Sequence, residues 1–286
     1  MFGLFNINKP VGLTSHDVVF RVRKQLPKGV KVGHAGTLDP FASGVLVLFA
    51  GSATRLASYV QQKPKRYTAG ITLGAFTESD DTETAPTAVI RAKAPDQAEV
   101  LAVLKGFIGE IMQRPPAHSA ISIGGQRAYK LARQGKTVEL AQRPVQIYNI
   151  DMLQYDYPLL KVEVSCGSGA YLRSLARDIG SVLKVGGYCS SLVRTAVGGF
   201  AIEDAVDIQA FQPDKHLIDA LRAVEDLPVV QLDDEQVGNI ILGRRVHHPA
   251  APCAKESALV DAAGKLVAIA SISDDAVVQP TIVLRK

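Results

Sequence analysis

A single carboxylate lies in a glycine-rich loop near the start of this sequence of 286 residues, and its surroundings suit chemistry. The segment 33–44 contains three glycines, one histidine (His34) and one acid, Asp39. Pro40 follows the acid and favours an extended backbone at Asp39. A lone carboxylate in a glycine-rich loop, within a basic stretch, is unusual for a mere turn. The alternative is an ordinary turn, because aspartate and proline both commonly form turns.

Two other patterns resemble ligand sites but lack residues that such sites require. Gly167 and Gly169 lie between a predicted strand and a predicted helix, as in a dinucleotide-binding turn, but Leu172 occupies the third glycine position. The six histidines are scattered, and the adjacent His247 and His248 point to opposite faces of a strand. We therefore expect no nucleotide cofactor and no bound metal.

Basic residues concentrate in two blocks, although the net charge is only +4. Residues 1–70 hold ten lysines and arginines against two acids, and residues 113–143 hold six against one. An acidic stretch, 77–100, separates them. This distribution favours a face that binds a polyanion, with ordinary surface scatter as the alternative.

Composition indicates a folded, non-membrane protein. Hydrophobic residues make up 47% of the chain, enough for a sizeable core. Apolar runs such as 45–50 are too short to span a bilayer, and the first residues lack the pattern of a signal peptide. Three cysteines (Cys166, Cys189 and Cys253) fit neither a disulfide framework nor a zinc motif, so a cytoplasmic location is expected.

Strands and helices alternate around the candidate loop. Apolar spacing predicts a helix from Ser15, taken as its N-cap, to residue 26, and another helix over 98–108. Strands are predicted over 45–50, 67–73 and 160–166, with a loop over 74–86. A third helix begins near Leu172 and ends at Gly186. Residues 113–143, rich in proline, glycine and basic side chains, are predicted to be a mobile excursion, named here the basic insertion.

A boundary is predicted near 225–232, where helical spacing gives way to strand spacing. The final segment has predicted strands over 266–272 and 277–284. With so few residues it is near the lower limit for independent folding, and we expect it to pack on the rest of the chain.

Several motifs together resemble the TruB-type tRNA pseudouridine synthases, in that family's order over residues 5–210. The matching positions are Asn8 to Gly12, Ser15, Gly33 to Pro40, Lys65 to Tyr67, Leu73, Gly74, Arg114 to Pro116, Ser119, Ala120, Gly125, Tyr129, Ala132 to Gly135, Cys166 to Ser174, Leu192 to Thr195, Gly198 and Phe200. The resemblance implies an α+β fold with a mixed, largely antiparallel sheet and a central cleft. It also implies a catalytic domain over 1–225 and a small β-rich, PUA-like RNA-binding domain over 226–286.

The activity implied by the resemblance is isomerisation of uridine to pseudouridine at position 55 of the TΨC loop of tRNA, by a monomer without a cofactor. The family's essential aspartate corresponds to Asp39, which either attacks C1′ or removes the C2′ proton; both roles remain open. The family arginine that corresponds to Arg173 pairs with this carboxylate. A buried carboxylate needs such a partner to remain ionised.

The resemblance also implies residues that hold the flipped base and the RNA. Tyr67 would stack on the base, with core packing as the alternative, while Tyr171 and Leu192 would line the base pocket. His34 would contact the reorganised loop. In the basic insertion, the candidates for phosphate contacts are Arg114, Arg127, Lys130 and Arg133. Ser122 and His118 depart from the family's usual lysine and aromatic residue, which leaves those two RNA contacts in doubt.

Two other functions compete with this enzyme. A non-catalytic tRNA-binding or tRNA-folding protein could keep the fold and the basic face, but it has no need for a carboxylate paired with Arg173. A small-molecule enzyme fits poorly with the basic blocks and with the missing third glycine of a nucleotide motif.

Overall fold

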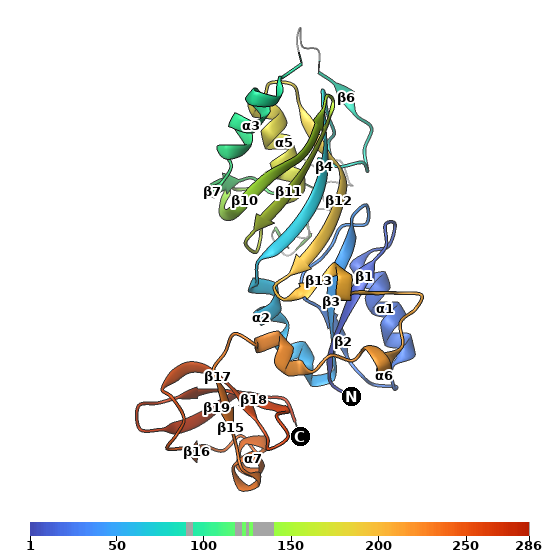
Figure 1. Ribbon diagram of the computed structural model, residues 1–286. Coiled ribbons are helices and arrows are strands. Elements are labelled where there is room, and N and C mark those ends of the chain that lie inside the picture. The colour runs from blue at the N-terminus through green and yellow to red at the C-terminus, as the bar shows by residue number, and fades with distance from the viewer. Residues whose placement is uncertain (90–93, 118–121, 124–125, 128–139, 286) are drawn as a thin grey trace.

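The computed structural model describes residues 1–89, 94–117, 122–123, 126–127 and 140–285 of the chain. These residues form an elongated body in which a long main sheet carries most of the helices, and a smaller sheet occupies the end that holds the C-terminus (Figure 1). Within the described part of the chain, no helix is long and apolar enough to cross a membrane.

The main sheet has ten strands in the order β14-β1-β3-β12-β4-β11-β10-β7, with β2 attached to β3 and β13 attached to β12. The β1–β14 and β3–β12 pairs are parallel, and the other pairs are antiparallel, so the predicted mixed, largely antiparallel sheet is confirmed. Its strands are β1 (Gly3–Lys9), β2 (Val32–His34), β3 (Ser43–Ala50), β4 (Lys65–Leu73), β7 (Gly109–Gln113), β10 (Arg143–Asp156), β11 (Leu159–Cys166), β12 (Gly187–Val197), β13 (Phe200–Ala201) and β14 (Val206–Asp207).

Helices cover the faces of this sheet. They are α1 (Ser15–Gln25), α2 (Ala57–Gln62), α3 (Gln97–Lys105), α5 (Leu172–Val182) and α6 (Pro213–His216), with 3-10 turns η1 (Gly51–Leu56), η2 (Ile202–Asp204) and η3 (Ala220–Val224). Short strand β5 (Ala75–Phe76) lies inside the predicted loop 74–86 and pairs with β6 (Thr87–Ala88), which follows it. Strand β8 (Ser122–Ile123) pairs with β9 (Gln126–Arg127).

The start of α1 differs from the prediction by one residue. Thr14, not Ser15, is the N-cap, and its side chain forms a capping box with Asp17. The sequence offers two neighbouring hydroxyl groups, and only tertiary contacts decide which one caps the helix. The Ser15 hydroxyl is used instead by the backbone of Leu38.

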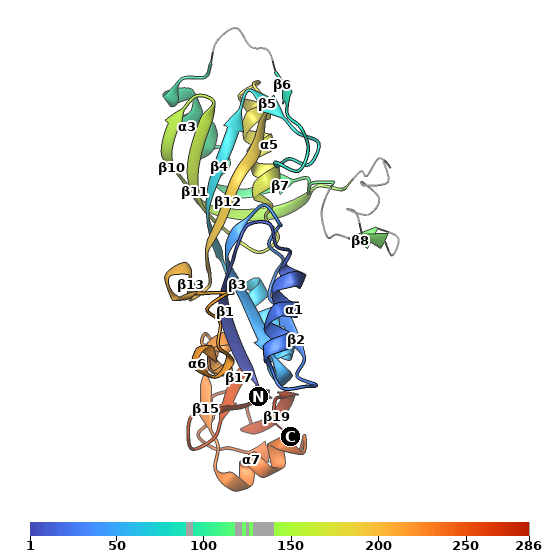
Figure 2. The same cartoon turned by 90° about the vertical axis from the view of Figure 1, so that its right-hand side faces the viewer.

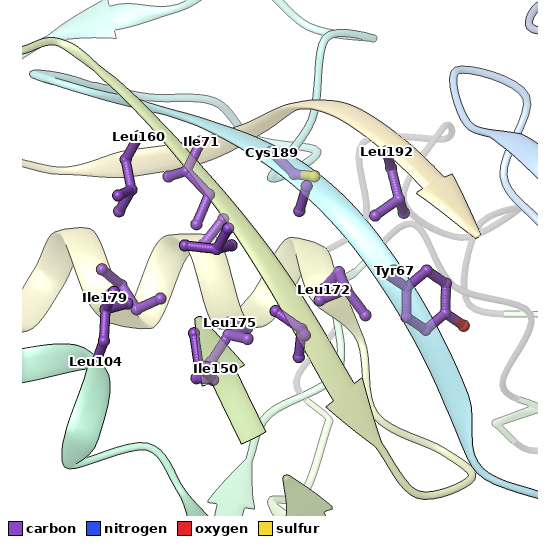
Figure 3. Close-up of a cluster of buried hydrophobic side chains, with 14 of the residues drawn as sticks. Tyr67, Ile71, Leu104, Ile150, Leu160, Leu172, Leu175, Ile179, Cys189 and Leu192 are labelled. Atoms are coloured by element: carbon purple, nitrogen blue, oxygen red, sulfur yellow. The ribbon is translucent and has the colours of Figure 1, made fainter. Parts of the chain in front are cut away.

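Alternating apolar residues build the core between the sheet and α5. In β4 every second residue from Lys65 to Leu73 is buried, as strand periodicity requires. The apolar side chains of β4 and β11 pack against Leu175 and Ile179 of α5 (Figure 3). Tyr67 belongs to this cluster and lies at one end of it, beside Leu192 in the figure.

The C-terminal segment forms a five-stranded sheet in the order β15-β17-β18-β19-β16, with α7 (Asp234–Ile241) beside it (Figure 2). The strands are β15 (Val229–Gln231), β16 (Val246–His247), β17 (Ala254–Val260), β18 (Leu266–Ile272) and β19 (Val277–Val283). Leu266 and Ile269 share one buried cluster with Leu4 and Phe49 of the main sheet. The expected packing of this segment on the rest of the chain is therefore confirmed.

Candidate active site

One cavity of about 580 Å³ gathers five of the residues predicted from the sequence. Its walls come from the loop before β3, from α2, β4 and β12, and from the turn that leads into α5. The predicted residues that line it are Asp39, Tyr67, Tyr171, Arg173 and Leu192. Segments that are far apart in the sequence thus meet at one site.

The guanidinium of Arg173 bridges two carboxylates in this cavity. Its Nε lies 2.9 Å from Oδ2 of Asp39, and its Nη1 lies 3.1 Å from Oδ2 of Asp81. Nη1 also donates a hydrogen bond to the carbonyl of Ser79 at 3.1 Å. Arg173 is only 3% exposed, so these ion pairs form largely away from bulk water, where salt screens charges less. The arginine thereby connects the Asp39 loop with the acidic loop.

Burial raises the pKa of Asp39 above its usual range. The positive charge of Arg173 opposes this shift, the negative charge of Asp81 adds to it, and Lys9 and Arg194 oppose it more weakly. The Asp39 side chain is nevertheless 31% exposed, because it faces the open cavity. A substrate can therefore reach a carboxylate whose ionised form depends on its cationic neighbours.

The hydroxyl of Ser15 fixes the loop that carries Asp39. It donates to the carbonyl of Leu38 at 3.1 Å and accepts the N–H of Leu38 at 2.9 Å. The N–H of Gly12 donates to the carbonyl of Pro40 at 2.7 Å. Residues on both sides of Asp39 are thus held by the start of α1 and the turn before it.

Ser15→Ala is expected to lower the free energy of unfolding by about 1–3 kcal/mol, because it leaves buried backbone groups of Leu38 unpaired. Denaturant unfolding would measure this, with Ser181→Ala as a control. Ser181 is exposed, and its hydroxyl bonds only to a carbonyl of its own helix. Equal losses for the two variants would contradict the role assigned to Ser15.

Arg194 of β12 supports the same loop and was missed as a site residue in the sequence. It is 2% exposed and donates to the carbonyls of Val45 at 2.7 Å, Gly36 at 3.3 Å and Thr37 at 3.4 Å. Gly44 permits this approach: it has φ +103°, and a Cβ there would lie 2.2 Å from the carbonyl oxygen of Arg194. Any larger residue at position 44 would separate β3 from β12.

Tyr67 combines the two roles that the sequence left open. Its ring is 8% exposed and packs in the apolar cluster, yet it also lines the cavity. In Figure 3 its hydroxyl points away from the other labelled side chains of the cluster. Burial raises the pKa of this phenol, so the hydroxyl is protonated at neutral pH.

Tyr171 and His34 differ in how they relate to the cavity. Tyr171 lines it, and the guanidinium of Arg143 lies 5.3 Å from the centre of its ring, at the distance of a cation–π contact. His34 lies in β2 and is not among the lining residues. Burial lowers the pKa of His34, which favours a neutral imidazole at neutral pH.

The structure describes only part of the basic insertion. Arg114 is exposed immediately after β7, and Arg127 lies in β9. The predicted phosphate contacts Lys130 and Arg133, together with His118, lie outside the described residues.

Asp81 was also missed by the sequence prediction, which noted the acidic stretch but chose no residue in it. It is 2% exposed and bonded to Arg173. Its neighbour Asp80 is paired at 2.8 Å with Arg177, the residue one turn after Arg173. The sequence signal was weak. Asp80 and Asp81 are adjacent acids in a turn-rich loop, and the arginines that pair with them lie far away in the sequence, four residues apart in α5.

Comparison with known proteins identifies the family. The family description "TruB family pseudouridylate synthase (N terminal domain)" matches residues 23–172, and "Pseudouridine synthase II TruB, C-terminal" matches residues 228–284. The chain therefore belongs to the TruB family of pseudouridylate synthases.

Individual relatives agree over most of the chain. It is 42% identical over 253 residues to tRNA pseudouridine synthase B of Dehalococcoides mccartyi, covering 86% of this chain and 84% of the relative. It is 39% identical over 288 residues to tRNA pseudouridine synthase B of Corynebacterium diphtheriae, covering 93% and 94%. A chain in the structure of an H/ACA RNP bound to a substrate RNA containing 2′-deoxyuridine superposes with a TM-score of 0.74 at 25% identity, covering 100% of this chain and 86% of that one.

Proposed function

We propose that this enzyme, which isomerises uridine to pseudouridine in tRNA, acts on position 55 of the TΨC loop with Asp39 as its catalytic carboxylate. The observation that carries the proposal is the 2.9 Å contact between Asp39 and Arg173 inside a cavity that Tyr67 and Tyr171 also line. A protein that only binds RNA has no need for a carboxylate paired with a buried arginine in such a cavity.

The reaction first requires the base to leave its stack. Extruding a nucleotide costs a few kcal/mol, and stacking on an aromatic ring returns about 1–3 kcal/mol. Tyr67 supplies that ring at the cavity wall, and its phenol is available to assist proton transfer at C5. Leu192 and Tyr171 enclose the base and exclude water from the reactive intermediate. His34 contacts the RNA loop outside the cavity.

The chemistry is an internal rearrangement. The bond from C1′ to N1 breaks, the uracil turns, a bond from C1′ to C5 forms, and the C5 proton is lost while N1 gains one. Asp39 either attacks C1′ or removes the C2′ proton, and both roles require its ionised form. Arg173 favours that form. Substrate deuterated at C2′ would distinguish the roles. Only proton removal breaks the C2′–H bond, so only that role predicts a large decrease in rate on deuteration.

The remaining surface holds the rest of the substrate. Arg114, Arg127, Lys130 and Arg133 contact phosphates, and residues 226–286 act as a PUA-like RNA-binding domain. Shape rather than base sequence dominates recognition of such a folded RNA. We further propose that the enzyme works as a monomer in the cytoplasm, where its tRNA substrate is processed.

Arg114→Ala is expected to weaken tRNA binding and to reduce the slope of log K against log salt concentration by about 1, because one phosphate contact is lost. Turnover at saturating tRNA should change little. Binding measured between low and moderate salt checks this, with the exposed Lys161→Ala as the control. An unaltered slope for Arg114→Ala would argue against a phosphate contact.

The direct test of the proposed function uses an unmodified tRNA transcript and purified protein. Pseudouridine should form at position 55 and at no other uridine, and a transcript with cytidine at position 55 should remain unmodified. Binding of the transcript without product would instead support the non-catalytic tRNA-binding protein. Product at another uridine would keep the activity but overturn the proposed position.

A further inference from the structure

The last residue of β7, Gln113, is a buried glutamine that the proposed chemistry does not use. It is 1% exposed. Its Nε2 donates to the carbonyl of Tyr171 at 3.1 Å, and its Oε1 accepts the N–H of Tyr171 at 2.8 Å. Both ends of one side-chain amide are thus satisfied by the backbone of a single residue, as in a strand pair.

The position of the Tyr171 backbone affects the position of Arg173. It is the N-cap of α5, and its side chain makes no capping hydrogen bond. Arg173, whose guanidinium contacts Asp39, comes two residues later in the first turn. A small rotation of the Tyr171 peptide would therefore move the guanidinium relative to the carboxylate.

Other residues at both ends of the basic insertion bond to the same part of the chain. The carbonyl of Arg114 accepts the hydroxyl of Ser174 at 2.8 Å and Nη2 of Arg177 at 2.9 Å. At the far end, Nη2 of Arg143 donates to the carbonyl of Gly169 at 2.8 Å. The two ends of the insertion are thus fastened to the start of α5 and the turn before it.

Apolar packing alone does not fix this geometry. Leu172, Leu175 and Ile179 bury the inner face of α5 against the sheet. Apolar contacts are non-directional, so they tolerate small rotations of the helix start. The paired hydrogen bonds of Gln113 are directional. The carbonyl of Tyr171 also accepts the N–H of Leu175 at 3.0 Å, whereas Gln113 is the partner of the Tyr171 N–H, and leaving that donor unpaired costs free energy.

We propose that Gln113 is a positioning residue, which holds the Tyr171 peptide so that Arg173 meets Asp39 in the orientation that the reaction needs. The inference rests on the proposed function, since it assigns the contact to catalysis. It also connects the root of the basic insertion to the cavity through described contacts.

Two variants test the proposal. Gln113→Met keeps the size of the side chain but removes both hydrogen bonds. Gln113→Glu keeps one acceptor and places a carboxylate oxygen against the carbonyl of Tyr171. Gln154→Met is the matched control, because Gln154 is exposed on β10 of the same sheet. The measurements are single-turnover rate constants at saturating tRNA, tRNA affinity, melting temperature and the pH dependence of the rate.

We expect Gln113→Met to lower the single-turnover rate about 10- to 100-fold, the range expected for a misplacement near 1 Å, with tRNA affinity within about twofold of wild type. The acidic limb of the pH–rate profile should move to higher pH. The charged groups that face Asp39 are Arg173, Asp81, Lys9 and Arg194, and only Arg173 is loosened by the substitution. Gln113→Glu should show the same changes, and Gln154→Met should show none.

Three results would overturn the proposal. The first is a rate within twofold of wild type for Gln113→Met. The second is a slower rate with the acidic limb unmoved, which would make Gln113 merely structural. The third is a loss confined to tRNA affinity. If either variant fails to fold, the other provides the answer. Failure of the proposed function is separate: wild-type protein would then form no pseudouridine at position 55.

Discussion

Asp39→Asn is expected to reduce pseudouridine formation by about 10²–10⁴-fold or more while leaving the fold and tRNA binding intact. Asparagine has nearly the same shape and can still accept a hydrogen bond from Arg173. It can neither attack C1′ nor remove a proton from C2′, so both proposed roles are lost. Removing a positioned proton-transfer group costs a factor of this size.

The measurement is a single-turnover assay with saturating tRNA, together with tRNA affinity and melting temperature for each variant. Asp156→Asn is the control, because Asp156 is an exposed acid at the end of β10. Activity near the wild-type level in Asp39→Asn would remove the basis of the proposed mechanism. Loss of tRNA affinity equal to the loss of rate would point to a binding role for Asp39 instead.

Much of the fold could be predicted because local spacing determines it. Strict alternation over β4 and β11 gives each strand one buried face, and the apolar spacing of Leu172, Leu175 and Ile179 gives α5 one buried face. These patterns can be recognised from residues only a few positions apart in the sequence. The mixed, largely antiparallel character of the sheet came only from the family resemblance, since pairing across a sheet, such as that of β3 with β12, leaves no periodic signal.

The candidate site was predicted less completely than the fold. Asp39 was marked by its loop, and Arg173 came from the family resemblance. Asp81 and Arg194 were missed, because their importance comes from burial and from contacts with residues 92 and at least 149 positions away. A buried charged side chain looks the same in sequence as an exposed one. Ser15 shows the same limit: a capping residue was expected, and a tertiary hydrogen bond was found.

Replacement of Arg173 is expected to have the second large effect, with Arg173→Lys lowering the rate at least about 100-fold and tRNA affinity changing little. The wild-type guanidinium uses separate nitrogens for Asp39 and Asp81. A lysine ammonium is a point charge without that planar fork, so it cannot hold both carboxylates in the same geometry. Arg173→Ala, which removes the charge, should be slower still.

The pH dependence tests the electrostatic part of this role. Burial and Asp81 raise the pKa of Asp39, and Arg173 opposes them. Loss of the guanidinium therefore raises that pKa further, and the carboxylate becomes protonated at a higher pH. Since both proposed roles need the ionised form, the acidic limb of the rate profile of Arg173→Ala should move upward in pH. Arg222→Lys is the control, because Arg222 is half-exposed and paired with Glu225, and neither residue lines the cavity. An unshifted acidic limb with a reduced rate would mean that Arg173 orients the reacting groups without controlling the charge of Asp39.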